Sequence, residues 1–348
     1  MHGISVFPGM GYPLEDNLKY LEEASKRGFT RVFTSLHIPE AGGSLEYEAA
    51  AIADKAASLG MELTADVSKG YLMKAESMGL KLHAMRLDFG YSLEEIAALS
   101  NSDMYRIQLN ASVLDERSLN RLLSIGLDPR NVEVCHNYYP RRDTGISWDY
   151  LKMRNDLFHS LGMKTIAFIP SRSGRRGPLF EGLPTVEVHR EILPMVSAQH
   201  LMKGGTDLVL FGDAAASLEE LDSLSGIRPE VARVPIRLLS DEADALAFLS
   251  GIHHNRRDPA EYVIRSEESR LNKKSKVFQS NCIKRAAYSV TIDNNGYGRY
   301  EGELQIVKKD LPADPRVNVI GSSLDGRLLI DMLGPGDAFE FHILKDRM

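Results

Sequence analysis

The stretch NVEVCHNYYPRRDTG (residues 131–145) contains a short apolar strand that ends in an unbroken run of polar and aromatic side chains. Val132 and Val134 are β-branched and apolar, as suits a buried strand. His136, Asn137, two tyrosines, a proline and two arginines follow at once. A strand that ends in this way indicates a fold in which the ends of strands carry the functional groups.

The same unit recurs through the first two thirds of the chain, where short apolar strands alternate with amphipathic helical stretches. Three of the helical stretches end at a glycine suited to a helix C-cap, namely Gly28, Gly60 and Gly162. Eight strand–helix units in about 225 residues predict an α/β fold, a (β/α)8 TIM barrel. A doubly wound open sheet is the main alternative, but no G-x-G-x-x-G motif follows the first strand. The expected strands lie near residues 3–7, 31–35, 62–67, 81–87, 105–109, 131–135, 164–169 and 207–211.

The last third of the chain has the composition of a small all-β domain. Asn295-Gly296 and Asp325-Gly326 are typical hairpin turn pairs. A chain of 348 residues suits one large domain and one smaller one. We therefore predict a TIM barrel domain over residues 1–235 and a small all-β barrel domain over residues 236–348.

Composition and charge exclude several classes of protein. The net charge of −6 argues against a general binder of nucleic acids or membrane surfaces. Two cysteines, Cys135 and Cys282, cannot form a disulfide framework or a zinc cage, which favours a reducing compartment. The N-terminus lacks a signal-peptide pattern, and no apolar run reaches ~18–20 residues. We predict a cytoplasmic protein without a nucleic-acid or membrane partner, and an oligomer remains possible.

The expected strand ends are consistently polar. In a TIM barrel the interior is filled by packed side chains and the chemistry lies where the strands end. Two alternatives are open: Asp66 and Asp88 as structural partners of a buried Arg86, and Asp213 as the N-cap of the last helix. The candidate functional residues at these ends are His37, Asp66, Arg86, Asp88, Asn110, His136, Asn137, Tyr139, Arg141, Arg142 and Asp213.

The loop at residues 170–190 is the longest of the predicted barrel, and long loops in compact domains are functional or disordered. Its bulky apolar residues and prolines favour an ordered lid, and it carries Arg172, Arg175 and Arg176. Glu181 lies between Phe180 and a glycine, and we expect apolar neighbours there to favour its protonated form.

No spacing in the sequence is typical of a metal or cofactor site. His37, Asp66, His136 and Asp213 are candidates to converge, but no His-x-x-x-His or Cys-x-x-Cys spacing supports a metal. A pyridoxal-phosphate racemase needs a Schiff-base lysine at a strand end, and no end offers one clearly. We predict no cofactor, and a metal-dependent sugar isomerase stays open as the weaker reading.

At RLDFG (86–90), CHNYYPR (135–141) and GPLFEGLPTVEVHR (177–190) the chain resembles a bacterial family, the 6-phospho-N-acetylmuramidases. The likeness covers essentially the whole chain. It implies a TIM barrel followed by a cyclophilin-like β-barrel domain. It also implies a cytoplasmic glycosidase that cleaves a 6-phospho-N-acetylmuramyl–N-acetylglucosamine disaccharide during cell-wall recycling.

Glycoside hydrolysis normally uses two carboxyl groups and no cofactor. The candidates are Glu181, Asp88, Asp66 and Asp213, with Glu181 favoured as proton donor and Asp88 or Asp66 as its partner. The N-acetyl group of the substrate is an alternative nucleophile, in which case the second carboxylate only orients it.

The remaining candidates suit binding of an anionic sugar. Tyr139 offers an aromatic face, and His136 and Asn137 offer hydrogen bonds to hydroxyl groups. Arg141 and Arg142 offer forked donors for a phosphate or a lactyl carboxylate. Asn110, Arg86 and His37 complete the expected binding residues. A phosphosugar isomerase or epimerase on the same barrel, and a non-catalytic phosphosugar-binding protein, remain alternatives.

Overall fold

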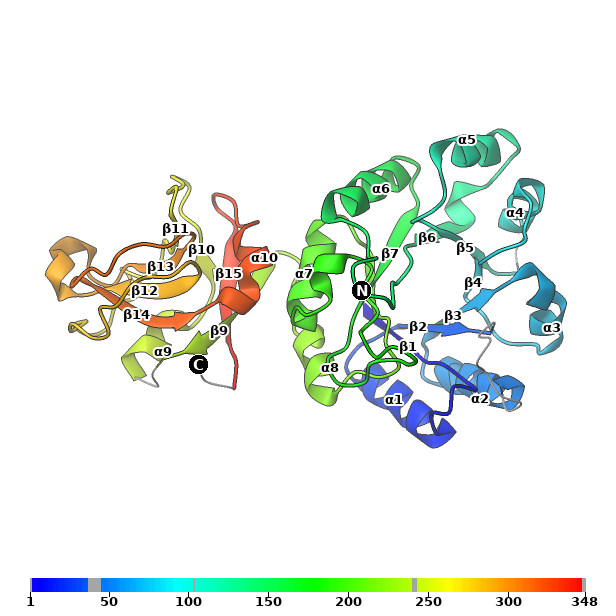
Figure 1. The fold of residues 1–348 in the computed structure, drawn as a ribbon, viewed down its shortest axis with the longest axis horizontal. Helices are drawn as coiled ribbons and strands as arrows, with labels where there is room; N and C mark the ends of the chain where they lie inside the picture. Colours follow the sequence, from blue (N-terminus) through cyan, green and yellow to red (C-terminus); the bar gives the residue numbers. More distant parts are fainter. Residues whose placement is uncertain (1, 37–44, 103, 240–242, 346–348) are drawn as a thin grey trace. The chain divides into compact units, whose positions relative to one another are not determined.

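The computed structural model describes residues 2–36, 45–102, 104–239 and 243–345, and the chain divides into two compact units (Figure 1). The first unit comprises residues 1–226 and the second comprises residues 227–348.

The first unit is a closed barrel of eight parallel strands in chain order, which confirms the predicted α/β fold class. Gly3 of the first strand is paired with Arg31 on one side and with Leu210 of the last strand on the other, so the sheet closes on itself. The strands are β1 (His2–Ser5), β2 (Arg31–Ser35), β3 (Glu62–Val67), β4 (Ala84–Leu87), β5 (Arg106–Asn110), β6 (Val132–Cys135), β7 (Lys164–Ile169) and β8 (Leu208–Phe211).

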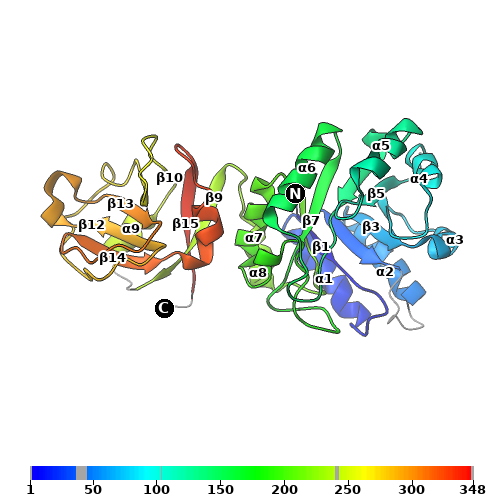
Figure 2. The ribbon, with the colours of Figure 1, turned by 45° about the horizontal axis from the view of Figure 1, so that its top comes forward.

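Helices surround this barrel on the outside (Figure 2). Gly28, Gly60 and Gly162 have φ of 81°, 69° and 75° just after three of the helices, in the left-handed conformation that favours glycine there. Ser92 and Ser217 begin two others with complete capping boxes. The helices are α1 (Leu14–Lys26), α2 (Leu45–Ser58), α3 (Leu72–Ser77), α4 (Leu93–Ser100), α5 (Glu116–Ser124), α6 (Trp148–Ser160), α7 (Pro194–Lys203) and α8 (Leu218–Ser225).

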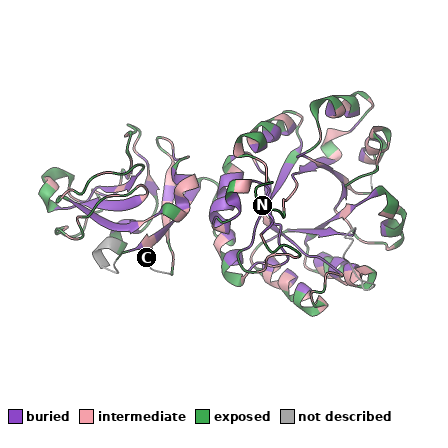
Figure 3. Ribbon diagram, viewed as in Figure 1, coloured by how far each residue is buried: buried purple, intermediate pink, exposed green. Residues whose placement is uncertain are grey.

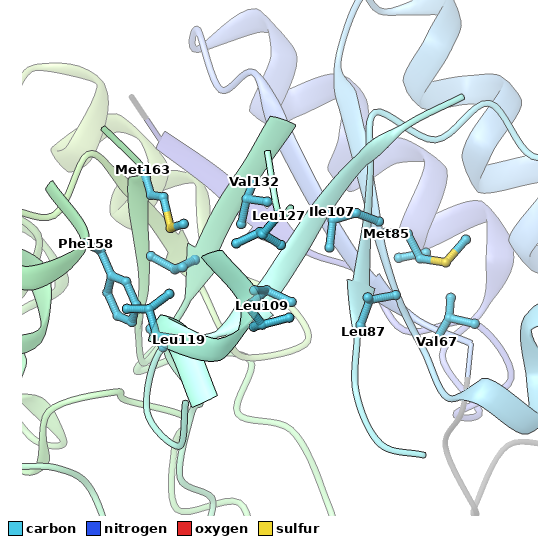
Figure 4. Packing of buried hydrophobic residues seen from close by; sticks show 14 of the residues in the cluster. Val67, Met85, Leu87, Ile107, Leu109, Leu119, Leu127, Val132, Phe158 and Met163 are labelled. Atoms are coloured by element: carbon cyan, nitrogen blue, oxygen red, sulfur yellow. The ribbon is translucent and has the colours of Figure 1, made fainter. Parts of the chain in front are cut away.

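The main apolar core of this unit includes the outward-facing strand residues (Figure 4). Met85 and Leu87 of β4 and Ile107 of β5 belong to it, and the strands are buried while the outer faces of the helices are exposed (Figure 3). Side chains alternate along a strand, so the residues between these, such as Arg86 and Gln108, face the barrel interior. Alternation therefore directs apolar residues to the helices and polar ones to the interior on this side of the barrel.

The other side of the interior is aromatic. The rings of Phe33 in β2 and Phe168 in β7 lie 5.2 Å apart, and their strands are not neighbours, so the contact crosses the interior.

A buried ion pair fills the interior near the amino ends of β2 and β6, where Arg31 and Glu133 lie 2.8 Å apart. The interior is packed, as in other TIM barrels, which leaves the carboxyl ends of the strands for chemistry.

The second unit is a nearly closed mixed sheet with its own apolar core. Its order is β10-β15-β9-β14-β12-β13-β11, and only the β15–β9 pairing is parallel. A bridge between Asn255 and Ser266 joins the segments that follow the two edge strands. The elements are β9 (Val231–Leu238), α9 (Ala243–Leu249), β10 (His253–His254), β11 (Val263–Arg265), β12 (Ser289–Asp293), β13 (Leu304–Val307), β14 (Val317–Ser322), α10 (Arg327–Ile330) and β15 (Ala338–Ile343).

The position at which we placed the domain boundary, residue 235, lies within β9. This strand pairs with β14 and β15 and so belongs to the sheet of the second unit. In the part of the chain that the structure describes, every helix is too short or too polar to cross a bilayer.

Candidate active site

A buried arginine gathers two carboxylates at the carboxyl ends of β3 and β4. Arg86 Nη1 lies 2.9 Å from Asp66 Oδ1 and 3.8 Å from Asp88 Oδ1. The Asp66 side chain is 16% exposed and that of Asp88 is 34% exposed, so both retain access to solvent. The register pairs Asp66 with Arg86 across neighbouring strands, which is why the two side chains meet.

Two asparagines extend this cluster to β5 and the end of β6. Arg86 Nη2 donates to Asn137 Oδ1 at 2.6 Å, and Asn110 Nδ2 donates to the same oxygen at 2.9 Å. The backbone N–H of Asn137 donates to Ser112 Oγ at 3.0 Å, which fixes the chain just beyond β6. The structure thus brings five predicted residues together, and we call Asp66, Arg86, Asp88, Asn110 and Asn137 the Arg86 cluster.

The spacing of the carboxylates suits glycoside chemistry. Because Asp66 and Asp88 both contact one nitrogen of Arg86, their contacting oxygens lie no farther apart than the sum of those two distances. Retaining glycosidases hold their carboxyls ~5–5.5 Å apart, and inverting ones ~6.5–9.5 Å. This upper limit includes the retaining range and reaches the inverting one, so the pair is compatible with either mechanism.

An aromatic wall with a second arginine forms the other side of the barrel mouth. The Tyr138 ring contacts Phe33 and Phe168 edge-on, so it lies on the interior side. Arg176 Nη1 donates to the Tyr138 hydroxyl at 3.0 Å, and its guanidinium lies 4.5 Å from the centroid of the Phe7 ring. Burial raises the pKa of Tyr138, against the opposing charge of Arg176, so the phenol keeps its proton at neutral pH.

Arg190 ties the loop after β6 to the long loop after β7. Its guanidinium donates to four backbone oxygens, those of residues 139, 141, 181 and 182, and to the carboxylate of Glu187. Glu187 in turn accepts from the backbone N–H groups of Asp143 and Gly145. Burial alone would raise the pKa of Glu187, but Arg190 and these N–H donors lower it to about 2. These contacts hold the long loop after β7 beside the loop after β6.

Asp213 binds the backbone of the long loop after β7. Its carboxylate is fully buried and accepts backbone N–H groups from Ser171, Arg176 and Leu183 at 2.8, 2.9 and 3.2 Å. Burial raises the pKa of Asp213, and the three N–H donors oppose that rise. The N-cap of α8 is Ser217, so the alternative role of Asp213 as a helix cap is wrong.

Glu181 lies among charged groups, where we had expected apolar ones. It accepts from the backbone N–H of Arg142 at 3.0 Å and lies 3.6 Å from the guanidinium of the same residue. Glu191 pairs with both Arg142 and Arg175, at 2.6 and 2.9 Å. These four residues form a charged network in the loops. Among the described residues, the hydrogen bonds and ion pairs of the Glu181 side chain do not reach the Arg86 cluster.

The other predicted binding residues that the structure describes lie outside the Arg86 cluster. His136 faces away from the interior, where its ring contacts Asn155 of α6 at 3.0 Å, and burial lowers its pKa to about 4. Tyr139 is half-buried and its backbone is paired with Pro184, while Arg141 is exposed. His37 is outside the described residues. Over the described ranges, no group of three or more His, Cys, Asp or Glu side chains is arranged to hold a metal ion.

Comparison with protein families covers both units. The description "6-phospho-N-acetylmuramidase, N-terminal" matches residues 2–226, and "6-phospho-N-acetylmuramidase, C-terminal" matches residues 234–342. The chain belongs to the 6-phospho-N-acetylmuramidase family. The resemblance seen in the sequence motifs is thereby confirmed.

Two solved structures resemble this 6-phospho-N-acetylmuramidase family member along its length. A conserved Enterococcus faecalis protein of unknown function is 30% identical, with a TM-score of 0.81, over 99% of this chain and 97% of that one. An uncharacterized B. cereus protein is also 30% identical, with a TM-score of 0.83, over 98% and 99% of the two chains. No curated protein matches the chain.

Two residues that the structure places at the mouth, Tyr138 and Arg176, were not among the candidates predicted from the sequence. Tyr138 follows the end of β6, where strand alternation no longer applies, and we had favoured its neighbour Tyr139. Arg176 was one of four arginines in the long loop, and nothing in the sequence ranked them.

Proposed function

We propose that this protein is a glycoside hydrolase that cleaves a 6-phospho-N-acetylmuramyl–N-acetylglucosamine disaccharide in peptidoglycan recycling. The name of its family supports this substrate and activity. A substrate of this kind is a cytoplasmic sugar phosphate, so the proposal includes a cytoplasmic site of action.

The observation that carries the proposal is the pair of carboxylates at the mouth. Asp66 and Asp88 share one nitrogen of Arg86 and retain access to solvent. One carboxyl group protonates the glycosidic oxygen, and the other attacks the anomeric carbon or activates water. Asp66, in the closer ion pair with Arg86, suits the ionised role of nucleophile or base, and Asp88 is its partner in the pair. If the N-acetyl oxygen of the substrate attacks instead, Asp66 orients that group.

The surrounding groups suit a sugar with an anionic substituent. Asn110 and Asn137 provide amide groups beside the carboxylates. Tyr138 provides an apolar ring in the barrel interior, and arginines are concentrated in the two adjoining loops. A charge-assisted contact from a guanidinium to an oxyanion is among the stronger polar contacts in proteins.

The decisive experiment is incubation of the purified protein with the phosphorylated disaccharide, followed by chromatography of the products. We expect release of free N-acetylglucosamine and 6-phospho-N-acetylmuramic acid. Conversion to an isomeric disaccharide that a chelator abolishes would instead favour the isomerase or epimerase. Tight binding without any conversion would favour the phosphosugar-binding protein.

A further inference from the structure

Arg176 differs from the other arginines of the two mouth loops in its surroundings. Its guanidinium is held between two rings, 4.5 Å from the centroid of Phe7 and 5.2 Å from that of Tyr138. Its backbone N–H is fixed by Asp213. The side chain is therefore held in place over rings of the barrel mouth, on a loop that has little freedom.

The charge of Arg176 has no carboxylate counterpart in the described parts of the chain, where its guanidinium donates a hydrogen bond to the Tyr138 hydroxyl. Its Nε is buried and has no hydrogen-bond partner among the same residues. Arg142 and Arg175, in contrast, are paired with Glu191. A partly buried cation without a counterion is costly to the fold, which indicates that it is kept for a ligand.

Cation–π contacts hold the guanidinium without neutralising it. The full charge stays available to an anion, which would not be so for an arginine already in an ion pair. Tyr138 adds a second donor, because its oxygen accepts from Arg176 and its own proton remains free to donate.

We propose that Arg176, with the Tyr138 hydroxyl, is the anion-binding element of the substrate site and determines specificity for a sugar that carries an oxyanion. This inference rests on the proposed function, whose substrate has two such groups, a phosphate and a lactyl carboxylate. The shared chemistry is an oxyanion bound by a guanidinium and a phenol.

The test compares kcat/KM on three disaccharides: the phosphorylated substrate, the same sugar without phosphate, and a 6-phosphorylated analogue without the lactyl group. Losing one charge-assisted contact lowers affinity by about 10- to 100-fold. Arg176→Met should lower kcat/KM by that factor on the phosphorylated substrate. If Arg176→Met leaves kcat/KM unchanged on the sugar without phosphate, the bound anion is the phosphate. If it leaves kcat/KM unchanged on the analogue without the lactyl group, the bound anion is the carboxylate.

Three further variants complete the comparison. Tyr138→Phe keeps the ring, and its kcat/KM should fall less than that of Arg176→Met but on the same substrates. The kcat/KM of Arg176→Lys should lie between those of Arg176→Met and wild type. Arg130→Gln removes an exposed arginine that is paired with Asp128, remote from the mouth residues, and should leave all three rates unchanged. If Arg176→Met does not fold, the Lys and Phe variants give the same readout.

Equal losses on all three sugars would overturn the proposal, as would a folded Arg176→Met protein with wild-type rates. Calorimetry with 6-phospho-N-acetylmuramic acid separates this result from failure of the proposed function. A protein that cleaves no disaccharide but binds this sugar, and loses 10- to 100-fold in affinity with Arg176→Met, supports the anion site alone. A wild type that binds neither this sugar nor its unphosphorylated form overturns both.

Discussion

Arg86 links the two aspartates at the barrel mouth, Asp66 and Asp88. Asp66→Asn and Asp88→Asn should each lower turnover by at least ~10²-fold, the usual scale for losing a general acid or base. Asparagine has nearly the same size as aspartate, so packing is little changed. Measuring kcat and the urea-unfolding midpoint for each variant separates a loss of chemistry from a loss of stability. Asp66→Asn should also reduce stability, because it leaves the buried Arg86 without its nearest counterion.

Glu181→Gln is the matched comparison for these variants. Its partner in the loops is the half-exposed Arg142, and pairs of this kind contribute roughly 0–1 kcal/mol. We expect turnover to change less than in the two aspartate variants. A loss as large as theirs would make Glu181 the proton donor, as the sequence led us to predict.

Strand alternation explains which mouth residues could be predicted. Val132 and Val134 face the helices, so alternation sends His136 to the same side and Asn137 to the mouth. This pattern was present in the sequence. Tyr138 lies past the strand end, where the backbone direction depends on the loop contacts, and no local pattern indicates that its ring turns inward.

Arg190 joins the loop after β6 to the long loop after β7. Arg190→Lys keeps the charge but cannot reach four carbonyls and Glu187 together, because an ammonium lacks the planar fork. We expect a stability loss of about 3 kcal/mol, typical of a broken buried pair, and a raised KM. Urea unfolding and limited proteolysis, which should cut between residues 170 and 190, provide the measurements.

An Arg190→Lys protein that resists proteolysis as well as wild type does would show that Asp213 alone holds the long loop.

Neither the Arg190 contacts nor the Asp213 contacts to the long loop were predictable from the sequence. Asp213 and Leu183 are well separated along the chain and meet only because β7 and β8 are adjacent. Of the bulky loop residues that led us to predict order, Leu183 is buried, whereas Leu179 and Phe180 are exposed.

Buried imidazoles make the stability of the whole molecule depend on pH. Burial lowers the pKa values of His136 and His200 from 6.5 to about 4. Between these values the unfolded chain binds protons that the folded protein does not, so stability is present above pH 6.5 and is lost as the pH falls towards 4. Each group accounts for up to ~3 kcal/mol.

Urea unfolding at pH 7 and pH 4.5 should therefore show a clear fall in the free energy of unfolding. His136→Gln lacks one titrating group and should lose less over the same interval. Equal unfolding free energies at the two pH values would mean that these rings are protonated in the folded protein or exposed in solution.

The second unit gives a prediction about its boundary. Six residues of β9, from Val231 to Ile236, pair with β15, so a fragment of residues 236–348 lacks most of a central strand. A fragment of residues 227–348 should fold with a cooperative unfolding transition, and the shorter one should not. Circular dichroism on heating distinguishes them, and a cooperative transition in the shorter fragment would support the boundary predicted from sequence.

The overall architecture was predictable because its signals are local and repeated. Eight apolar strands, amphipathic helices and the glycines at 28, 60 and 162 each act within a few residues, and together they specify a barrel. The strand order of the second unit was not predictable, since the parallel pairing of β9 with β15 joins the two ends of that unit.

Asp213 recognises its loop only through backbone N–H groups, and this has an evolutionary consequence. Every residue except proline presents such a group, so the side chains at positions 171, 176 and 183 are not specified by these bonds. The aspartate should tolerate almost no replacement, while position 176 can change its side chain and leave the loop backbone intact. Descendants of this protein can therefore acquire a preference for a different sugar by one substitution, without first rebuilding the loop.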